Sequence, residues 1–193
     1  MHNSGMKMRT ILGCILALIT SHAALASETV YETSESFLAA AFPEAVPSAS
    51  VLWLQQSLRA EVTDILDQRP GMRIRYWQDG ERTAWILDDI GKDKPITAGF
   101  VVQNGAIARV QVLVFRESRG WEVKYPFFTR QFQQARLSGG GKLTQDVDGI
   151  TGATLSVRAM KRMARAALLL DGHVQQTGAN HPTLAKTGAA ASN

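Results

Sequence analysis

The sequence predicts an α+β fold: a single domain in which an antiparallel sheet with a central hairpin packs against helices. Two observations predict it. The middle of the chain alternates apolar and polar residues, as half-buried strands do, and segments with helical spacing lie before and after it. Asn104-Gly105, between two of the alternating runs, is the strongest short-range indication of a hairpin. Of the 193 residues, the 167 that follow the predicted leader (193 − 26) suffice for one domain with a proper core.

Two helices are predicted before the sheet, over residues 34–41 and 49–68. The second has an apolar stripe at helical spacing, formed by Leu54, Leu58, Val62, Ile65 and Leu66. Arg69-Pro70-Gly71 ends it, because proline cannot continue a helix and glycine favours a turn.

Four strands are predicted next, over residues 72–77, 83–87, 97–102 and 106–115. Asp79-Gly80 forms the turn between the first two, and Asn104-Gly105 forms the hairpin turn between the last two. The apolar positions of the last strand suit a covered antiparallel sheet.

The last third of the chain is predicted to be helical. A short helix is expected over residues 127–135, and a strong helical run extends over residues 155–170 and is closed by Gly172. The polar segment 173–193, rich in alanine, glycine and asparagine, is expected to be a disordered tail.

The N-terminus has the order of a secretory leader. Lys7 and Arg9 precede an apolar run over residues 11–19, and the small residues at 24–26 suit a signal peptidase. The run is about half of the ~20 apolar residues that a spanning helix needs. Residues 1–26 are therefore expected to be a cleaved signal peptide, and the protein is expected to be periplasmic.

The same leader contains Cys14, the chain's one cysteine. Its removal leaves no residue for disulfides, thiolate chemistry or iron–sulfur ligation, so redox work requires a bound cofactor. Loss of Lys7 and Arg9 also lowers the formal net charge of +4 by two. No nucleic-acid motif is present, and His173 and His181 lack metal-ligand spacing, so neither nucleic acid nor a metal is expected.

A loop-to-helix junction carries the most informative residues. It follows the loop Gly139-Gly140-Gly141 and extends from Asp148 through Thr151 to Thr154, ahead of the long helix. Backbone N–H groups at the start of a helix lack partners and lie at the positive end of the helix dipole, which makes such a junction a phosphate seat. The same three residues also suit the role of a helix N-cap, and the residue types alone leave both interpretations open.

The stretch from Asp148 to Thr154, Asp-Gly-Ile-Thr-Gly-Ala-Thr, resembles the flavinylation motif of the FMN-binding domain family, Asp-x-x-(Ser/Thr)-Gly-Ala-Thr. In that family a flavin transferase esterifies FMN through its phosphate to the final threonine. The resemblance implies covalent FMN on Thr154, with Gly152 and Ala153 letting backbone N–H groups approach the phosphate. Thr151 either bonds a phosphate oxygen or caps the helix. Asp148 either accepts loop N–H groups or is recognised by the transferase, and Ser156 is either a phosphate contact or a first-turn residue.

A second segment is similar to the family. Residues 117–120, Glu-Ser-Arg-Gly, resemble a family loop built on Glu-Thr-Pro-Gly beside the flavin, with serine in place of threonine and arginine in place of proline. The resemblance implies flavin contacts from Glu117 and Gly120. It covers about residues 95–170, so an FMN-binding region is expected over 95–172 and N-terminal helices and first strands over 27–94. An apolar wall for the isoalloxazine, or else core packing, is expected from three aromatic residues: Trp121, Tyr125 and Phe128.

These expectations define a periplasmic electron-transfer flavoprotein, matured by a flavin transferase and serving a membrane-bound or periplasmic redox partner. The family includes subunits of the sodium-pumping NADH:quinone reductase and of the related ferredoxin-linked Rnf complex. Two alternatives stay open: a flavin-dependent terminal reductase of a small acceptor or ferric chelate, and a non-redox module whose Thr-Gly-Ala-Thr is a helix cap. A basic helix stripe is either solvated or a docking face for an acidic partner; it comprises Arg158, Lys161, Arg162 and Arg165.

Overall fold

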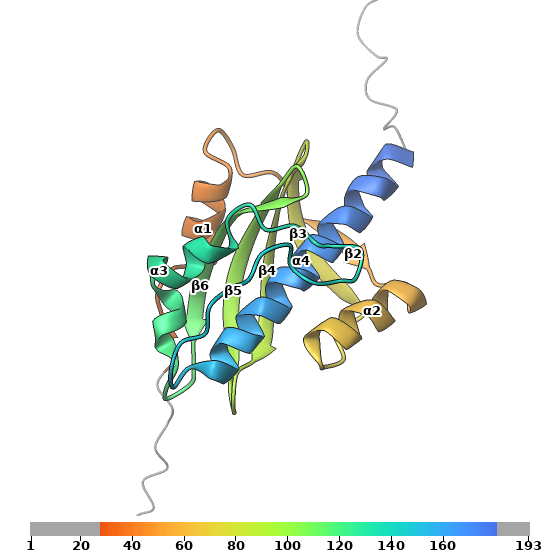
Figure 1. Cartoon of the computed structure of the whole chain (residues 1–193). Helices are drawn as coiled ribbons and strands as arrows, with labels where there is room; N and C mark the ends of the chain where they lie inside the picture. Colours follow the sequence, from red (N-terminus) through yellow and green to blue (C-terminus); the bar gives the residue numbers. More distant parts are fainter. Residues whose placement is uncertain (1–27, 181–193) are drawn as a thin grey trace, which may run out of the picture.

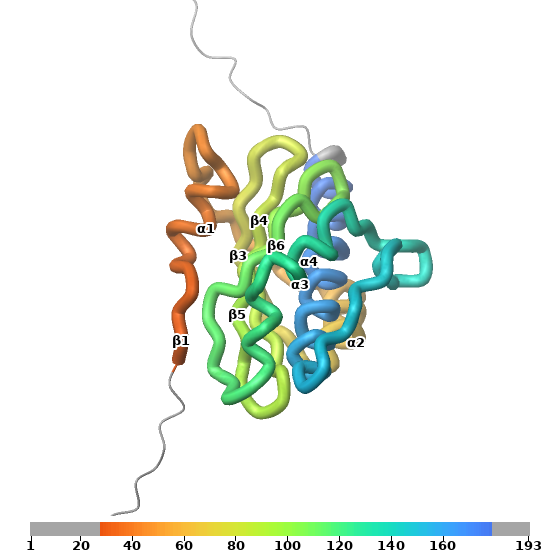
Figure 2. The backbone as a smooth tube through the Cα atoms, turned by 60° about the vertical axis from the view of Figure 1, so that its left-hand side comes forward, coloured from red at the N-terminus to blue at the C-terminus, as the bar shows by residue number. Residues whose placement is uncertain are grey.

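The computed structural model describes residues 28–180, so the predicted leader and most of the predicted tail lie outside the described residues. It has three layers (Figures 1 and 2): a sheet in the middle, α2 and α4 across one face, and α1 on the other. The sheet has six strands in the order β1-β6-β5-β4-β3-β2, and every pair is antiparallel. The predicted α+β fold class is confirmed.

The strands are β1 (Thr29–Val30), β2 (Ser50–Trp53), β3 (Arg73–Asp79), β4 (Arg82–Ile90), β5 (Pro95–Gln103) and β6 (Ala106–Phe115). The predicted hairpin joins β5 to β6. Asn104 and Gly105 both have positive φ, 53° and 69°, which the twist of a two-residue hairpin turn requires. All four strands that the alternation predicted are therefore present.

The helices are α1 (Ser34–Ala41), α2 (Gln56–Leu66), η1 (Trp121–Lys124), α3 (Pro126–Thr129), η2 (Arg130–Phe132) and α4 (Thr154–Asn180). Helix α1 has the predicted bounds, and its N-cap Thr33 accepts the N–H of Ser36 at 3.2 Å. None of the helices in the described part of the chain is long and apolar enough to cross a membrane.

The prediction of one helix over residues 49–68 is wrong in its first part. Residues 50–53 form β2, in which Val51 pairs with Arg75 and Leu52 pairs with Ile74. Val51 is β-branched and Trp53 is aromatic, and both residue types favour a strand. The helical spacing of apolar residues corresponds to a helix only from α2 onward. There four of the five predicted stripe residues, Leu58, Val62, Ile65 and Leu66, are buried on the helix. The fifth, Leu54, is buried but lies before α2.

The helix predicted over residues 127–135 is also wrong in its extent. The chain makes one turn of α-helix in α3 and one 3-10 turn in η2, and it leaves helical geometry before Gln134, whose φ is +66°. Phe128 and Phe132 are fully buried and produce the apolar spacing that resembled a longer helix.

The last helix is longer than predicted. Gly172 does not close α4, which continues to Asn180, so the expected tail over 173–193 is wrong for residues 173–180. Asp171 and Val174 remain buried against the sheet, and this packing outweighs the low helix propensity of one glycine.

Two apolar cores hold the layers together. The larger lies between the sheet and the helices α2 and α4, and Trp85, Phe100 and Met160 are fully buried in it. The smaller lies under α1, where Phe37 occupies the space above Gly99. A Cβ on Gly99 would lie 2.6 Å from the Phe37 ring, so this strand position requires glycine.

Candidate functional site

A hollow of about 530 Å³ lies at the start of α4. Three segments that are distant in sequence line it: Lys92 in the turn between β4 and β5, residues 117–119 after β6, and the helix start from Gly152 to Ser156. In Figure 1 these segments meet at the end of the sheet where α4 begins. The predicted residues Glu117, Gly152, Ala153, Thr154 and Ser156 are thus brought together.

No side chain of residues 28–180 caps the first turn of α4. Ala153 precedes the helix, and its carbonyl accepts the N–H of Val157 at 2.9 Å. Alanine is among the poorest N-cap residues. Within residues 28–180, no acceptor bonds the backbone N–H groups of Thr154, Leu155 or Ser156, nor does a side-chain oxygen of Asp148 or Thr151 reach this turn. The interpretation of this motif as a helix cap is therefore wrong.

The turn before the helix depends on Gly152. Its φ is +83°, in the left-handed region, while a Cβ there would meet nothing within 4 Å. Glycine is needed for the backbone angle and not for space. Ala153 is buried, and its N–H donates to the carbonyl of Ile150 at 2.9 Å. Thr151 and Thr154 are exposed, so the Thr154 side chain stands on the solvent side of the first turn.

Gly120 lets the segment after β6 touch the helix. Its φ is +85°, and a Cβ would lie 2.3 Å from Oγ of Ser156 and 3.5 Å from Cα of Ala153. Ser156 is 4% exposed and belongs to the first turn of α4. Ser156 therefore has the expected first-turn position and also borders the hollow. Its other expected role, a phosphate contact, stays a prediction.

Glu117 holds the opposite wall. Its Oε1 accepts the backbone N–H groups of three consecutive residues, Lys92, Asp93 at 2.7 Å and Lys94 at 2.9 Å. The carboxylate therefore fixes the β4–β5 turn against the segment after β6. This role was not predicted, because the turn it binds lies 23 to 25 residues away and has no recognisable pattern.

An ion pair with a buried carboxylate fixes the end of β4, next to the β4–β5 turn. Asp89, at the end of β4, is 1% exposed, and its carboxylate accepts Nε of Arg162 on α4 at 2.7 Å. Arg162 also donates to the carbonyl of Ile90 at 3.0 Å. Burial raises the pKa of Asp89, and the bond from Arg162 opposes that effect in part. Helix, strand and turn are thus locked together next to the hollow.

The predicted basic stripe on α4 has fewer free side chains than its four residues suggest, because some of them are already bonded within the protein. Arg162 is engaged by Asp89, and Nε of Arg165 donates to the carbonyl of Gly141 at 2.6 Å. Arg158 is exposed one turn after Thr154. Arg158 and Lys161 form no ion pair with residues of the described part. A docking face of four free cations is therefore not present on α4.

The donor set of the hollow suits a phosphate. Two cations, Lys92 and Arg119, border it, and three unbonded helix N–H groups point out of the first turn. Among the described residues that border the hollow, only Glu117 has a carboxylate, and it already accepts three N–H groups. Lys92 and Arg119 were not predicted as site residues. Only the arginine gave a sequence indication, because it replaces the proline of the family loop.

Asp148 lies outside this donor set. It is exposed, its N–H donates to Oε1 of Gln131 at 2.7 Å, and its carboxylate accepts no hydrogen bond from the described residues. The expectation that Asp148 holds the loop by accepting N–H groups is therefore wrong. The loop is held instead by Gln145, whose side-chain amide donates to the backbone carbonyls of Gln131 and Gln133, the latter at 3.1 Å.

The three candidate aromatic residues divide into two groups. Phe128 is fully buried in the core, so it is not a free wall for a ring. Trp121 and Tyr125 are each 40% exposed and meet edge to face, with ring centroids 5.7 Å apart. Nζ of Lys124 lies 5.2 Å and 5.1 Å from these two rings.

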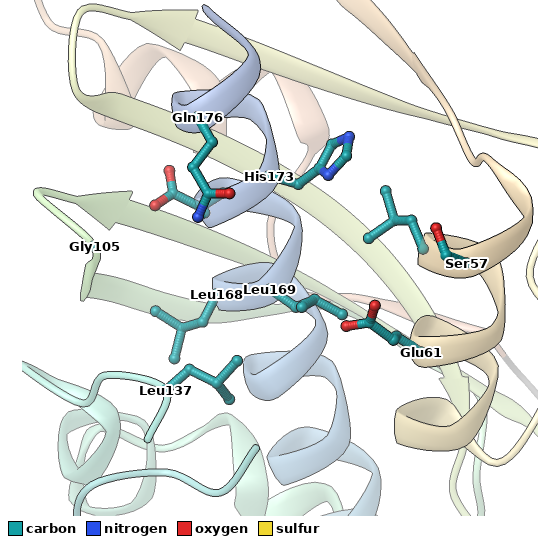
Figure 3. Close-up of a pocket in the computed structure, with 11 residues that line it drawn as sticks. Ser57, Glu61, Gly105, Leu137, Leu168, Leu169, His173 and Gln176 are labelled. Atoms are coloured by element: carbon teal, nitrogen blue, oxygen red, sulfur yellow. The ribbon is translucent and has the colours of Figure 1, made fainter. Parts of the chain in front are cut away.

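A second hollow, of about 470 Å³, lies along the other half of α4 (Figure 3). Ser57 and Glu61 on α2 face Leu169 and His173 on α4 there, and no lysine or arginine is among the lining residues. The described residues contain no group of three His, Cys, Asp or Glu side chains that could hold a metal. This hollow therefore suits neither a phosphate nor a metal ion.

A buried carboxylate borders the second hollow. Oδ1 of Asp171 accepts the hydroxyl of Thr83 at 2.7 Å, and that hydroxyl accepts Nε1 of Trp85 at 2.8 Å. Burial raises the pKa of Asp171, while the bonds from Thr83 and Gln175 oppose the shift in part. The chain of bonds satisfies polar groups that the core buries.

Comparison with known families gives a match over the part of the chain that lines the first hollow. The sequence model of the FMN-binding domain family matches residues 91–169, a range that includes the β4–β5 turn, the segment after β6 and the start of α4. No curated protein matches the chain.

Proposed function

Because the chain belongs to the FMN-binding domain family, and so binds FMN, we propose that it is a periplasmic electron-transfer flavoprotein whose FMN is esterified to Thr154. One observation carries the point of attachment. Thr154 is the first residue of α4, it is exposed, and the N–H groups of the turn that it begins have no acceptor within the described residues. An ester on its Oγ1 would keep the phosphate oxygens within reach of those N–H groups.

In this proposal each part of the hollow has a separate task. The helix N–H groups bind phosphate oxygens, and Gly152 supplies the backbone angle that leaves them open. Glu117 and Gly120 position the walls, because the first holds the β4–β5 turn and the second packs on Ser156. Asp148, exposed and free of side-chain bonds to the described residues, is the element that the flavin transferase recognises.

The bound flavin would supply the electron chemistry, because the chain outside the predicted leader has no cysteine for redox work. A covalent bond suits an exported protein, since it prevents loss of the cofactor by dilution. The order of residues 1–26 supports export. A membrane-bound or periplasmic redox partner would then exchange electrons with the flavin.

The experiment is the intact mass of the mature protein after co-expression with a flavin transferase. We expect a mass gain equal to esterified FMN and a mature N-terminus after Ala26. Thr154→Ala should lose the gain completely, whereas Thr177→Ala is the matched control, because Thr177 is an exposed threonine on the same helix that does not border the hollow. A gain that survives in Thr154→Ala would refute the attachment site.

A second candidate, a terminal reductase of a small acceptor or ferric chelate, is favoured by the open hollow beside Thr154. It differs in its kinetics. The reductase would turn over a ferric chelate with saturation, whereas a carrier would exchange electrons with dyes and proteins without a saturable small substrate. Steady-state oxidation of the reduced, loaded protein by ferric citrate separates the two.

A further inference from the structure

Two cations border the hollow on the sides that face the helix start. Lys92 lies in the β4–β5 turn, and its side chain is 73% exposed, with Asp93 3.6 Å away as its ion-pair partner. Arg119 lies in the segment after β6, is exposed, and forms no ion pair or hydrogen bond with the described residues. A side chain without an internal partner keeps its full donor set available to a ligand.

The backbones that carry these cations are fixed, although the side chains extend into solvent. Glu117 binds three N–H groups of the turn that contains Lys92. Gly120, next to Arg119, packs against Ser156 at a distance that excludes even a methyl group. A fixed backbone limits the region that each long side chain can sample, and the region of both includes the mouth of the hollow.

We propose that Arg119, assisted by Lys92, binds the phosphate that approaches the start of α4 and so determines the hollow's preference for a phosphate ester. This inference rests on the proposed function, because the phosphate is that of FMN. Guanidinium presents a planar fork of donors to two oxygens, and such charge-assisted bonds are about twice as strong as neutral ones. The helix N–H groups alone would orient the phosphate, but they would not supply the positive charge of the guanidinium.

The arrangement predicts a ligand-binding site in the protein before esterification. Inorganic phosphate should bind the apo protein at the first turn of α4, with Arg119 making the larger contribution. Lysine would keep the charge and lose the fork, so Arg119→Lys should retain part of the affinity. Lys92→Gln should have a smaller effect, because its ammonium is more exposed and is shared with Asp93.

The test is a titration of the 15N-labelled apo protein with inorganic phosphate, followed by amide NMR at Thr154, Leu155 and Ser156, with chloride at equal ionic strength as the control. We expect saturable shifts at these amides in the parent. Arg119→Gln should weaken the affinity about tenfold, as expected for loss of a hydrogen bond to a charged group. Arg130→Gln, an exposed arginine that does not border the hollow, should leave it unchanged.

Equal affinity in the parent and in Arg119→Gln would overturn the inference, as would shifts that do not saturate. Thr154→Ala separates this result from the proposed function. If that variant binds phosphate like the parent while the parent takes up no flavin, the phosphate site stands and the flavin attachment fails. If the parent is flavinylated normally but Arg119→Gln binds phosphate equally well, the attachment stands and the role of Arg119 fails.

Discussion

Helix α4 passes two hollows, one at its start and one along its second half, and they differ in charge more than in size. The first has about 530 Å³, two cations and three free helix N–H groups, while the second has about 470 Å³, two carboxylates and a histidine. A helix dipole favours anions at the N-terminus and cations at the C-terminus. Only the first hollow agrees with an anionic ligand, so volume alone would not have identified the site.

The two hollows also treat a buried aspartate differently. Near the first, Asp89 is paired with Arg162 and locks a wall of the site. At the second, Asp171 has neutral partners, the hydroxyl of Thr83 and the amide of Gln175. An ion pair therefore fixes the wall of the first hollow, whereas a chain of hydrogen bonds satisfies the buried polar groups beside the second hollow. The following predictions test this contrast, from the largest expected effect to the smallest.

The largest effect is expected from Gly120→Ala. The new Cβ would lie 2.3 Å from Oγ of Ser156, and alanine would be forced to a φ of +85°. Overpacking and a left-handed residue together cost about 2–5 kcal/mol. Urea unfolding of the apo protein measures the loss, and flavin uptake should fall with it.

The matched control at the second hollow is Gly172→Ala. A Cβ there would meet nothing within 4 Å, and the position is inside α4, so alanine should stabilise the protein by about 0.5–1 kcal/mol. A destabilised Gly172→Ala together with a tolerated Gly120→Ala would reverse the contrast between the two hollows.

A smaller loss is expected from Asp89→Asn. The change leaves the Arg162 guanidinium beside a neutral amide in a largely buried place, and breaking a buried pair in this way costs about 3 kcal/mol. Thermal unfolding measures it. Arg158→Gln, on the same helix but exposed, is the comparison, and a similar loss there would show that the ion pair has no special importance.

Loading with flavin should stabilise the fold modestly. The phosphate would supply the acceptors that the first turn of α4 lacks, and a helix N-cap contributes about 1 kcal/mol. Differential scanning calorimetry of loaded and apo protein measures this difference. Thr154→Ala treated with the same transferase and then freed of unattached flavin should unfold at one temperature whether or not flavin was supplied.

The smallest effect is a pH dependence at the second hollow. Burial raises the folded-state pKa of Asp171 above its unfolded value, so the unfolded chain releases this proton first as pH rises. The contribution of the protonated group is complete below the unfolded pKa and is lost as pH rises through the folded pKa. The stability of the parent relative to Asp171→Asn should therefore decrease over that window. A relative stability that increases with pH would contradict the neutral hydrogen-bond chain.

The sequence predicted those features that depend on neighbouring residues. Asn104-Gly105 specified the hairpin because turn geometry is local, and the stripe of α2 indicated its buried face. The motif around Thr154 located the helix start for the same reason. Segment 50–53 was assigned wrongly because its strand identity depends on pairing with β3, whose residues lie 20 to 26 positions further along the chain.

The contacts that form the walls of the site could not be predicted from the sequence. Glu117 was expected at the flavin, yet it binds a turn whose residues carry no pattern, and Lys92 enters the site only through that turn. The pair between Asp89 and Arg162 joins residues 73 positions apart. Such contacts depend on the tertiary arrangement, which local propensity does not contain.

Three segments that are distant in sequence meet at Thr154, and this arrangement bears on when a cofactor could be attached during maturation. The hollow is lined by Lys92, residues 117–119 and residues 152–156, which come together only after the strands have paired and α4 has packed across the sheet. Under the proposed function, a flavin transferase that recognises this surface would find it in the folded protein and in none of the separate segments. Maturation would then have an order, in which the polypeptide folds first and receives its cofactor second.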